Sequence, residues 1–231
     1  MNEMWFAPIR TYCERGDASF WAEPLNAVSN GAFLIAAAAL VWRERVSRGG
    51  DLAVLSLAIL IALVGIGSFL FHTLAVRWSL LADVIPIALF IYAYFLLAMR
   101  RFLGLGFISA VGATLLFAAF NMGLEPALDA LTGHSMEAAT NGSLAYLPAV
   151  LALAGVAIGL VLKPAADGPE RRAARALVLI AGLFAVSLTL RTLDVALCTV
   201  WPIGTHFLWH LLNAAVLFGL GATALRFRQT A

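Results

Sequence analysis

The chain has 231 residues, of which 62% are hydrophobic and 12% are charged, and its mean hydropathy is +0.93. Soluble domains contain about 25% charged residues, so this composition excludes an ordinary soluble protein and indicates an integral membrane protein. The formal net charge of +2 is too small, and the arginines are too dispersed, for a nucleic-acid-binding surface, so we expect no DNA or RNA partner.

The first residues, MNEMWFAPIRTYCERGD, are mixed and polar, without the apolar core and small-residue cleavage site of a signal peptide. We therefore expect residues 1–24 to form a retained segment outside the bilayer and the first helix to direct insertion. There is no internal repeat and no sign of a second domain. We predict one domain over residues 1–231, with its helices within 25–225.

Seven apolar stretches have roughly the 20 residues that are needed to cross a bilayer. The predicted fold class is therefore all-α, a polytopic membrane protein with a bundle of seven transmembrane helices. The predicted spans are, in chain order, Leu25–Trp42, Leu52–Val76, Ser79–Met99, Gly104–Leu124, Leu144–Leu162, Ala176–Leu197 and His206–Leu225. The charged stretch KPAADGPERRAAR, between the fifth and sixth spans, is interpreted as a loop.

The distribution of cations predicts the direction of these spans, because short cytoplasmic loops collect Lys and Arg. Eleven cations lie on one side of the predicted spans and three on the other. The larger group is Arg43, Arg45, Arg48, Arg100, Arg101, Lys163, Arg171, Arg172, Arg175, Arg226 and Arg228, and the smaller group is Arg10, Arg15 and Arg77. We therefore predict that the N-terminus lies outside and the C-terminus in the cytoplasm.

Five polar side chains fall at one depth of this topology, toward the outside. Ser68 and His72 lie near the end of the second span and Asp83 near the start of the third, in GSFLFHTLAVRWSLLAD. The last span opens with THFLWHLLN, which places His206 and His210 at the same level. Within each helix the pairs are four residues apart, so Ser68 shares a face with His72, and His206 with His210.

Three imidazoles and a water form the ligand set of a catalytic zinc ion, which keeps one coordination position open. Imidazole also suits copper, iron and nickel, so zinc is a preference. Each residue alone has a simpler interpretation: a histidine that bonds a neighbouring carbonyl, or an Asp83 that relays protons or pairs with Arg191 or Arg77. A metal site is favoured because separate helices place their ionisable groups at one depth.

Three other residues are given structural roles. Arg191 and Asp194, three positions apart in LRTLDVALC, are predicted to form a structural ion pair. Trp209 is expected to pack against neighbouring helices or lipid, and His134 to be solvated in a loop.

The segments SFLFH, LLAD, HFLWH and YCERGDASFWAEPLNAVSN, in this order and spacing, resemble a bacterial member of the alkaline ceramidase family. The family that it resembles lies within the wider superfamily of seven-helix membrane hydrolases that includes adiponectin-receptor-like proteins. The resemblance implies that His72, His206 and His210 hold zinc, and that Ser68 and Asp83 hydrogen-bond the water on that metal. It implies hydrolysis of the amide bond of ceramide, or of a related N-acyl lipid, to a fatty acid and a long-chain amine.

The resemblance also implies two features of the N-terminal segment. One is a calcium site built from Glu14, Asp17 and Glu23, together with Asn26. The other is a disulfide between Cys13 and Cys198, which are the only cysteines and both fall on the predicted outer side. The expected location is a bacterial inner membrane, with the active site toward the periplasm and membrane lipids as partners.

Two alternatives to a hydrolase stay open, and a third is excluded. A retinal-binding protein needs a lysine in the last helix, whereas the only lysine is Lys163, in a loop. An ion- or proton-coupled transporter would use Asp83 and the histidines as ion sites, and a receptor would bind a lipid without cleaving it. The sequence indicates no oligomeric state.

Overall fold

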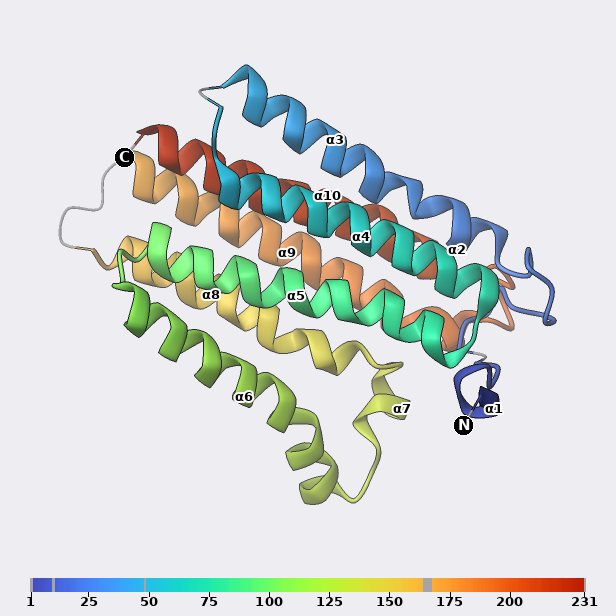
Figure 1. Ribbon diagram of the computed structural model, residues 1–231. Helices are drawn as coiled ribbons and strands as arrows, with labels where there is room; N and C mark the ends of the chain where they lie inside the picture. The colour runs from blue at the N-terminus through green and yellow to red at the C-terminus, as the bar shows by residue number, and fades with distance from the viewer. Residues whose placement is uncertain (1, 10, 48, 164–167, 231) are drawn as a thin grey trace.

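The protein forms a bundle of long helices, seen in a computed structural model that describes residues 2–9, 11–47, 49–163 and 168–230 (Figure 1). Seven helical segments of this part are long and apolar enough to cross a membrane, so the predicted all-α bundle of seven spans is confirmed. The elements are α1 (Asn2–Trp5), α2 (Pro24–Ser29), α3 (Gly31–Val46), α4 (Leu52–Leu74), α5 (Arg77–Arg101), α6 (Phe107–Thr132), α7 (Met136–Thr140), η1 (Ser143–Tyr146), α8 (Leu147–Val161), α9 (Gly168–Leu197) and α10 (His206–Thr230).

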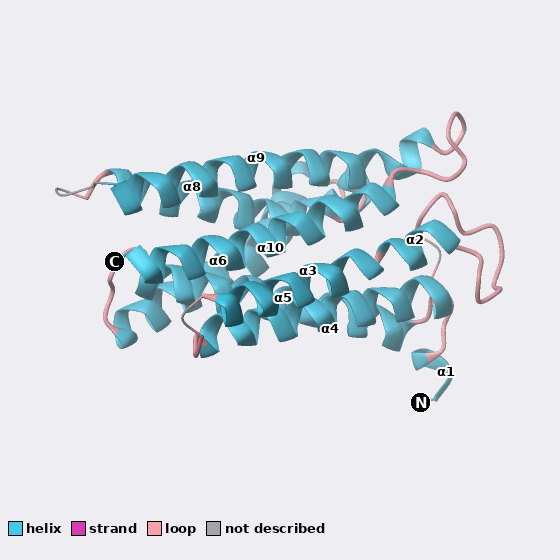
Figure 2. Ribbon diagram, turned by 90° about the horizontal axis from the view of Figure 1, so that it is seen from above, coloured by secondary structure: helices cyan, strands magenta, loops and turns pink. Residues whose placement is uncertain are grey.

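The last helix, α10, lies in the centre of the bundle. It packs most extensively against α9 and α3 and also contacts α2, α4 and α5. Figure 2 shows α8 and α9 on one side of it and α3, α4 and α5 on the other. Of the seven spans it is the most buried, whereas α6 is the least buried, at the edge. The histidines at the start of α10 are therefore surrounded by other helices and buried.

The spans match the predicted ones in number and order, but several helices are longer than their apolar stretches, α6 and α9 by the most. The helix α6 continues beyond Leu124 to Thr132 and ends where Gly133 adopts the left-handed conformation, with φ 71°. The helix α9 begins at Gly168 and includes residues Glu170–Arg175. The interpretation of this charged stretch as a loop was therefore wrong for residues 168–175, because Ala, Arg and Glu favour helix whether or not lipid surrounds them.

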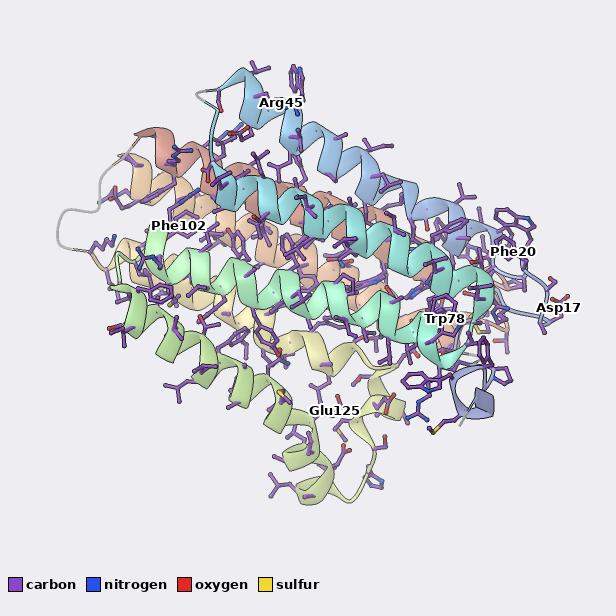
Figure 3. All side chains as sticks on the ribbon, in the orientation of Figure 1. Asp17, Phe20, Arg45, Trp78, Phe102 and Glu125 are labelled. Atoms are coloured by element: carbon purple, nitrogen blue, oxygen red, sulfur yellow. A yellow bond between two sulfur atoms is a disulfide. The ribbon has the colours of Figure 1, made fainter. Side chains whose placement is uncertain are left out.

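One end of the bundle carries the N-terminal loop, residues 11–23, and is called the site end below. Just before this loop the chain pairs with the turn between α4 and α5, because the Ile9 N–H donates to the Ala75 carbonyl at 2.7 Å. Figure 3 shows Asp17 and Phe20 at the tip of the loop, where it projects from the bundle. The opposite end contains the ends of α3, α5, α8 and α10 and the starts of α4, α6 and α9 (Figure 1).

Candidate metal centre

Three histidines converge inside the site end. One turn of α10 supplies His206 and His210, and the last turns of α4 supply His72. Their ring centroids are 4.6 to 5.1 Å apart, and one nitrogen from each ring lies within 4.8 Å of the others. All three side chains are buried. The predicted convergence is confirmed, and such a group of imidazole nitrogens can hold a metal ion.

Hydrogen bonds from the start of the first span orient two of these rings. The His72 Nδ1 lies 2.6 Å from the Glu23 Oε2, and the His210 Nδ1 lies 2.7 Å from the Ser29 Oγ. Both rings therefore turn their Nε2 atoms away from these partners, and the His72 Nε2 is buried without a hydrogen bond. The His206 Nδ1 is likewise buried and unpaired. Ligand histidines in metal sites are held in this way through their other nitrogen.

The role of Ser29 was missed from the sequence, and that of Glu23 was assigned to calcium instead. A signal for Ser29 exists, because Asn26, Ser29 and Asn30 recur at helical spacing within an apolar span. Burial alone would raise the pKa of Glu23, but hydrogen bonds from His72, Asn26 and Arg15 outweigh it and lower that pKa. The surroundings of Glu23 therefore favour its charged form beside the histidines.

The predicted catalytic pair, Ser68 and Asp83, also meets at this end. The Ser68 hydroxyl lies close enough to the Asp83 carboxylate to stabilise its charged form, and the charge of Asp83 interacts with His72. The Asp83 Oδ1 is buried without a hydrogen-bond partner. This contact depends on Gly67, because a Cβ there would lie 1.9 Å from the Ala82 carbonyl oxygen of α5. The glycine in GSFLFH thus lets α4 and α5 approach closely beside the histidines.

The predicted ion pair between Arg191 and Asp194 is wrong. The Asp194 Oδ1 accepts hydrogen bonds from the backbone N–H groups of Thr205 and His206, at 2.6 and 2.9 Å, and its Oδ2 accepts one from Cys13 at 3.1 Å. Free N–H groups at a helix N-terminus attract a carboxylate more strongly than a side chain one turn away. Asp194 therefore fixes where α10 starts, and so fixes the position of His206 along the axis of the bundle.

Arg191 points in another direction, toward the N-terminal loop and η1. Its Nη1 donates to the Asn141 carbonyl and its Nη2 to the Tyr12 hydroxyl at 3.4 Å. The Tyr12 ring stacks on His206 with a centroid distance of 3.6 Å. Trp209, predicted to pack, is buried against Tyr146. His134, predicted to be solvated, is exposed.

Most of the side-chain oxygens assigned to calcium already have other partners, and the exception is the Asn26 Oδ1, which is buried without one. The Glu14 carboxylate accepts hydrogen bonds from the backbone N–H groups of Leu25 and Asn26 at 2.7 and 2.8 Å, and so caps α2. Burial raises the pKa of Glu14, although these two bonds oppose the shift. The Asn26 Nδ2 donates to Glu23 at 3.0 Å, and the Asp17 Oδ1 accepts from the Ser19 N–H. Among the described residues, the histidines are the one group of at least three His, Cys, Asp or Glu side chains close enough to share a metal ion.

A guanidinium occupies the centre of the N-terminal loop instead. Arg15 is buried, and its Nε donates to the Glu23 carboxylate. Its Nη2 donates to the His72 carbonyl at 2.7 Å, and its Nη1 lies 3.3 and 3.5 Å from the carbonyls of Asp17 and Ser19. One predicted calcium ligand, the Glu23 carboxylate, and the carbonyls of Asp17 and Ser19 are therefore turned toward an arginine, whose positive charge opposes a calcium ion at this place.

A disulfide joins Cys13 to Cys198, as the resemblance implied. It connects the N-terminal loop to the segment between α9 and α10, across 185 positions of sequence. In that segment Gly204 has φ 64°, and a Cβ there would lie 2.1 Å from the Asp194 Oδ1 and 2.9 Å from the Cys13 Cβ. The disulfide, the aspartate cap and this glycine together hold the start of α10 against the loop.

Fold and site together define an integral, multi-pass membrane protein with a buried histidine triad that can hold a metal ion. The family model for ceramidase matches residues 11–225, which include the N-terminal loop and all of the site described above. The chain therefore belongs to the ceramidase family. Membership makes the protein a hydrolase that acts on the amide bond of ceramide. No curated protein matches the chain.

Proposed function

We propose that the protein is a zinc-dependent intramembrane amidase that hydrolyses ceramide, or a related N-acyl lipid, to a fatty acid and a long-chain amine. The observation that carries this proposal is the convergence of His72, His206 and His210, buried and with ring nitrogens left unpaired. Membership in a family of hydrolases favours this function over the transporter and receptor alternatives.

The histidine triad fits a zinc ion by the chemistry of its donors. Three neutral imidazoles leave the charge of the ion uncompensated and one coordination position open. Glu23 and Ser29 act on the far nitrogens of His72 and His210 and so would fix these rings for coordination. A zinc ion in this place supplies a hydroxide nucleophile near neutral pH and polarises the amide carbonyl.

Asp83 and Ser68 are the groups that would move and hold protons in the reaction. Hydrolysis forms a C–O bond to the carbonyl carbon and breaks the C–N bond of the amide. The free Oδ1 of Asp83 can accept the proton of the attacking water and deliver it to the leaving nitrogen, which departs as an amine. The Ser68 hydroxyl, on the adjacent turn of α4, can orient the water or donate to the oxyanion.

We propose that the site end faces the outside, which in a bacterial inner membrane is the periplasm. The disulfide supports this orientation, because disulfides persist in oxidising compartments. The concentration of cations at the opposite end supports it as well. Two arginines of the cation count, Arg10 and Arg48, lie outside the described residues. A calcium ion in the N-terminal loop is not part of this proposal, because Arg15 places a positive charge against Glu23 and the Asp17 carbonyl.

Metal analysis combined with hydrolysis assays tests the proposed function. Purified protein should contain about one zinc per chain, lose ceramide hydrolysis when the metal is removed and regain it with added zinc. Asp83→Asn should retain zinc but lower turnover by about 10²–10⁴-fold, which is the typical contribution of a general base. His210→Ala should lose both zinc and turnover.

The control is His134→Ala, because this histidine is exposed and outside the triad. It should retain zinc and full activity. Full hydrolysis by metal-free protein, or by Asp83→Asn, would refute the proposed chemistry.

A further inference from the structure

A large cavity opens beside the histidine triad. It has a volume of about 710 Å³ and lies between α5, α6, α7, η1 and the N-terminal loop. Figure 1 shows α6 diverging from α5 toward the site end, with α7 following the far end of α6. The wall of the cavity includes Tyr12, which stacks on His206, and Arg191, which donates to the Tyr12 hydroxyl. The Tyr12 ring therefore lies between the cavity and His206, a candidate metal ligand.

Arg191 brings a positive charge into this wall with neutral partners around it. Its guanidinium donates to the Asn141 carbonyl and the Tyr12 hydroxyl, and its Cζ lies 5.5 Å above the Tyr146 ring and 5.7 Å above the Trp209 ring. No carboxylate in the described part of the chain forms an ion pair with it. Asp83 acts on it only through the longer-range field of its charge. A charge is expensive inside a membrane protein unless a counter-charge neutralises it.

The depth of Arg191 and the shape of the cavity suit the head group of a lipid. The cavity shares Ile87, Ile91 and Tyr146 with a second cavity, which is almost entirely apolar and lies between α5, α8, α9 and α10. A lipid amide near the histidines could thus place its head group against Arg191, whereas the apolar cavity, with a volume of about 50 Å³, is too small to enclose a long acyl chain. Because a guanidinium binds a carboxylate through two parallel hydrogen bonds, a carboxylate is the group that its free N–H donors match.

Two glutamates on the same wall limit the charge of the ligand. Glu125 and Glu137 also line the cavity, and neither forms an ion pair with Arg191, whose hydrogen bonds go to Asn141 and Tyr12. A head group with several negative charges would meet these carboxylates, whereas a single carboxylate beside Arg191 would not.

We propose that N-acyl lipids with one carboxylate in the head group, such as N-acyl amino acids, are substrates of this site in addition to ceramide, with Arg191 as the counter-charge. This inference rests on the proposed amidase function. It adds a specificity-determining residue to that site and names the chemical class that the residue selects.

A matched pair of lipids tests this proposal. N-Palmitoylglycine and N-palmitoylethanolamine share the acyl chain and the amide, but the first ends in a carboxylate and the second in a hydroxyl. The zinc-loaded protein should show a kcat/KM about tenfold or more higher for N-palmitoylglycine. Arg191→Gln should lower that value by about 10–100-fold and the value for the ethanolamide by less than about threefold, because a charged hydrogen bond contributes that much. Arg191→Lys should retain part of the preference.

Binding to metal-free protein gives a second readout that needs no turnover. N-Palmitoylglycine should raise the Tm of the metal-free wild type more than the ethanolamide does, and this difference should disappear in Arg191→Gln. Arg77→Gln is the matched control, since Arg77 is an exposed arginine at the start of α5 and does not line the cavity. It should behave as the wild type.

The outcomes separate this inference from the proposed function. If ceramide is hydrolysed but the two amides are bound and cleaved equally, or Arg191→Gln affects both equally, the inference is overturned and the amidase function stands. If no lipid amide is hydrolysed and the carboxylate still binds preferentially through Arg191, the binding site stands and the amidase function fails. If Arg191→Gln does not fold, the inference is tested by two other measurements. These are the preference of the wild type for N-palmitoylglycine and the retention of part of that preference in Arg191→Lys.

Discussion

At the scale of single residues, Arg15 supplies the positive charge inside the N-terminal loop. Its guanidinium bonds the Glu23 carboxylate and backbone carbonyls of the loop and of His72, so it takes the position that a bound cation would otherwise fill. Through Glu23 it also supports the hydrogen bond to His72. Arg15 is thus a positioning residue for the metal centre, and the charge that organises the loop is part of the chain.

We expect calcium to leave the wild-type protein unaffected. Adding calcium to zinc-loaded, calcium-free protein should leave its Tm unchanged and its kcat/KM within about twofold, because the Arg15 charge already lies against Glu23 and the loop carbonyls. Arg15→Gln removes that charge and should lower the Tm and weaken zinc binding by about 10–100-fold, as loss of a partner behind a metal ligand does. Calcium should then raise the Tm of this variant. Thermal unfolding with and without calcium measures both effects.

The comparison for this experiment is Arg77→Gln, which removes an exposed arginine at the same end of the bundle. Calcium should have no effect on it. A rise in the wild-type Tm with calcium would show that the loop binds the ion despite Arg15.

The residues of the site differ in how far the sequence could predict them. His72, His206 and His210 were predictable, because helix periodicity and the depth of each span place them together. Glu23 as the partner of His72 was not, since that contact depends on how the N-terminal loop folds back over α4. Asp194 was assigned to Arg191 by spacing alone, and the segment that follows α9 in fact turns back to bring the start of α10 to its carboxylate.

At the scale of the helices, the approach of α4 to α5 determines whether Ser68 reaches Asp83. The two helices pack closely at Gly67, where the Ala82 carbonyl occupies the space of a side chain. Apolar length predicted both spans well, but it carries no information about such contacts. For the same reason it could not predict the ends of α6 and α9, where polar residues continue a helix that the apolar pattern has left.

Gly67→Ala should lower turnover strongly and thermal stability only moderately. A Cβ 1.9 Å from the Ala82 carbonyl oxygen must push α4 and α5 apart, and such overpacking costs about 1–3 kcal/mol. We expect a Tm lower by several degrees and turnover lower by at least about tenfold, because the separation moves Ser68 away from Asp83. Thermal unfolding and ceramide hydrolysis, measured below the Tm of the variant, check the two effects.

Gly182→Ala in α9 provides the control, because no atom lies within 4 Å of a Cβ at that position. It should leave turnover unchanged and the Tm equal or slightly higher, since alanine favours helix over glycine. Wild-type turnover in Gly67→Ala would show that the helix approach does not set the catalytic geometry.

At the scale of the whole molecule, different interactions hold the helices together at the two ends of the bundle. The disulfide and Asp194 hold the site end. At the opposite end, Asp51 accepts hydrogen bonds from the Nη1 and Nη2 atoms of Arg101 at 2.9 and 3.0 Å, lies 3.4 Å from Arg228 and caps α4. This cluster joins the ends of α4, α5 and α10, so it should affect stability without touching the chemistry.

The pH dependence of stability should reveal the Asp51 cluster. Burial alone would raise the pKa of Asp51, but its hydrogen bonds to Arg101, the charge of Arg101, the Val54 N–H and Arg228 together lower it below the usual value. A carboxyl whose pKa is lower in the folded state stabilises the fold above its unfolded pKa, about 3.9, and loses that contribution as the pH falls through the folded value.

Asp51→Asn should therefore lower the Tm at pH 7 by roughly 2–8 °C, from the loss of charged hydrogen bonds, and this deficit should shrink as the pH falls below about 4. Ceramide hydrolysis at pH 7, well below the Tm, should stay at the wild-type rate, because the cluster lies at the end opposite the histidines. Thermal unfolding between pH 3 and pH 8 measures the deficit, with Arg45→Gln, an exposed charge at the same end, as the control. A deficit that is the same at pH 3 and pH 7 would mean that Asp51 acts through packing and the cap of α4, and not through its charge.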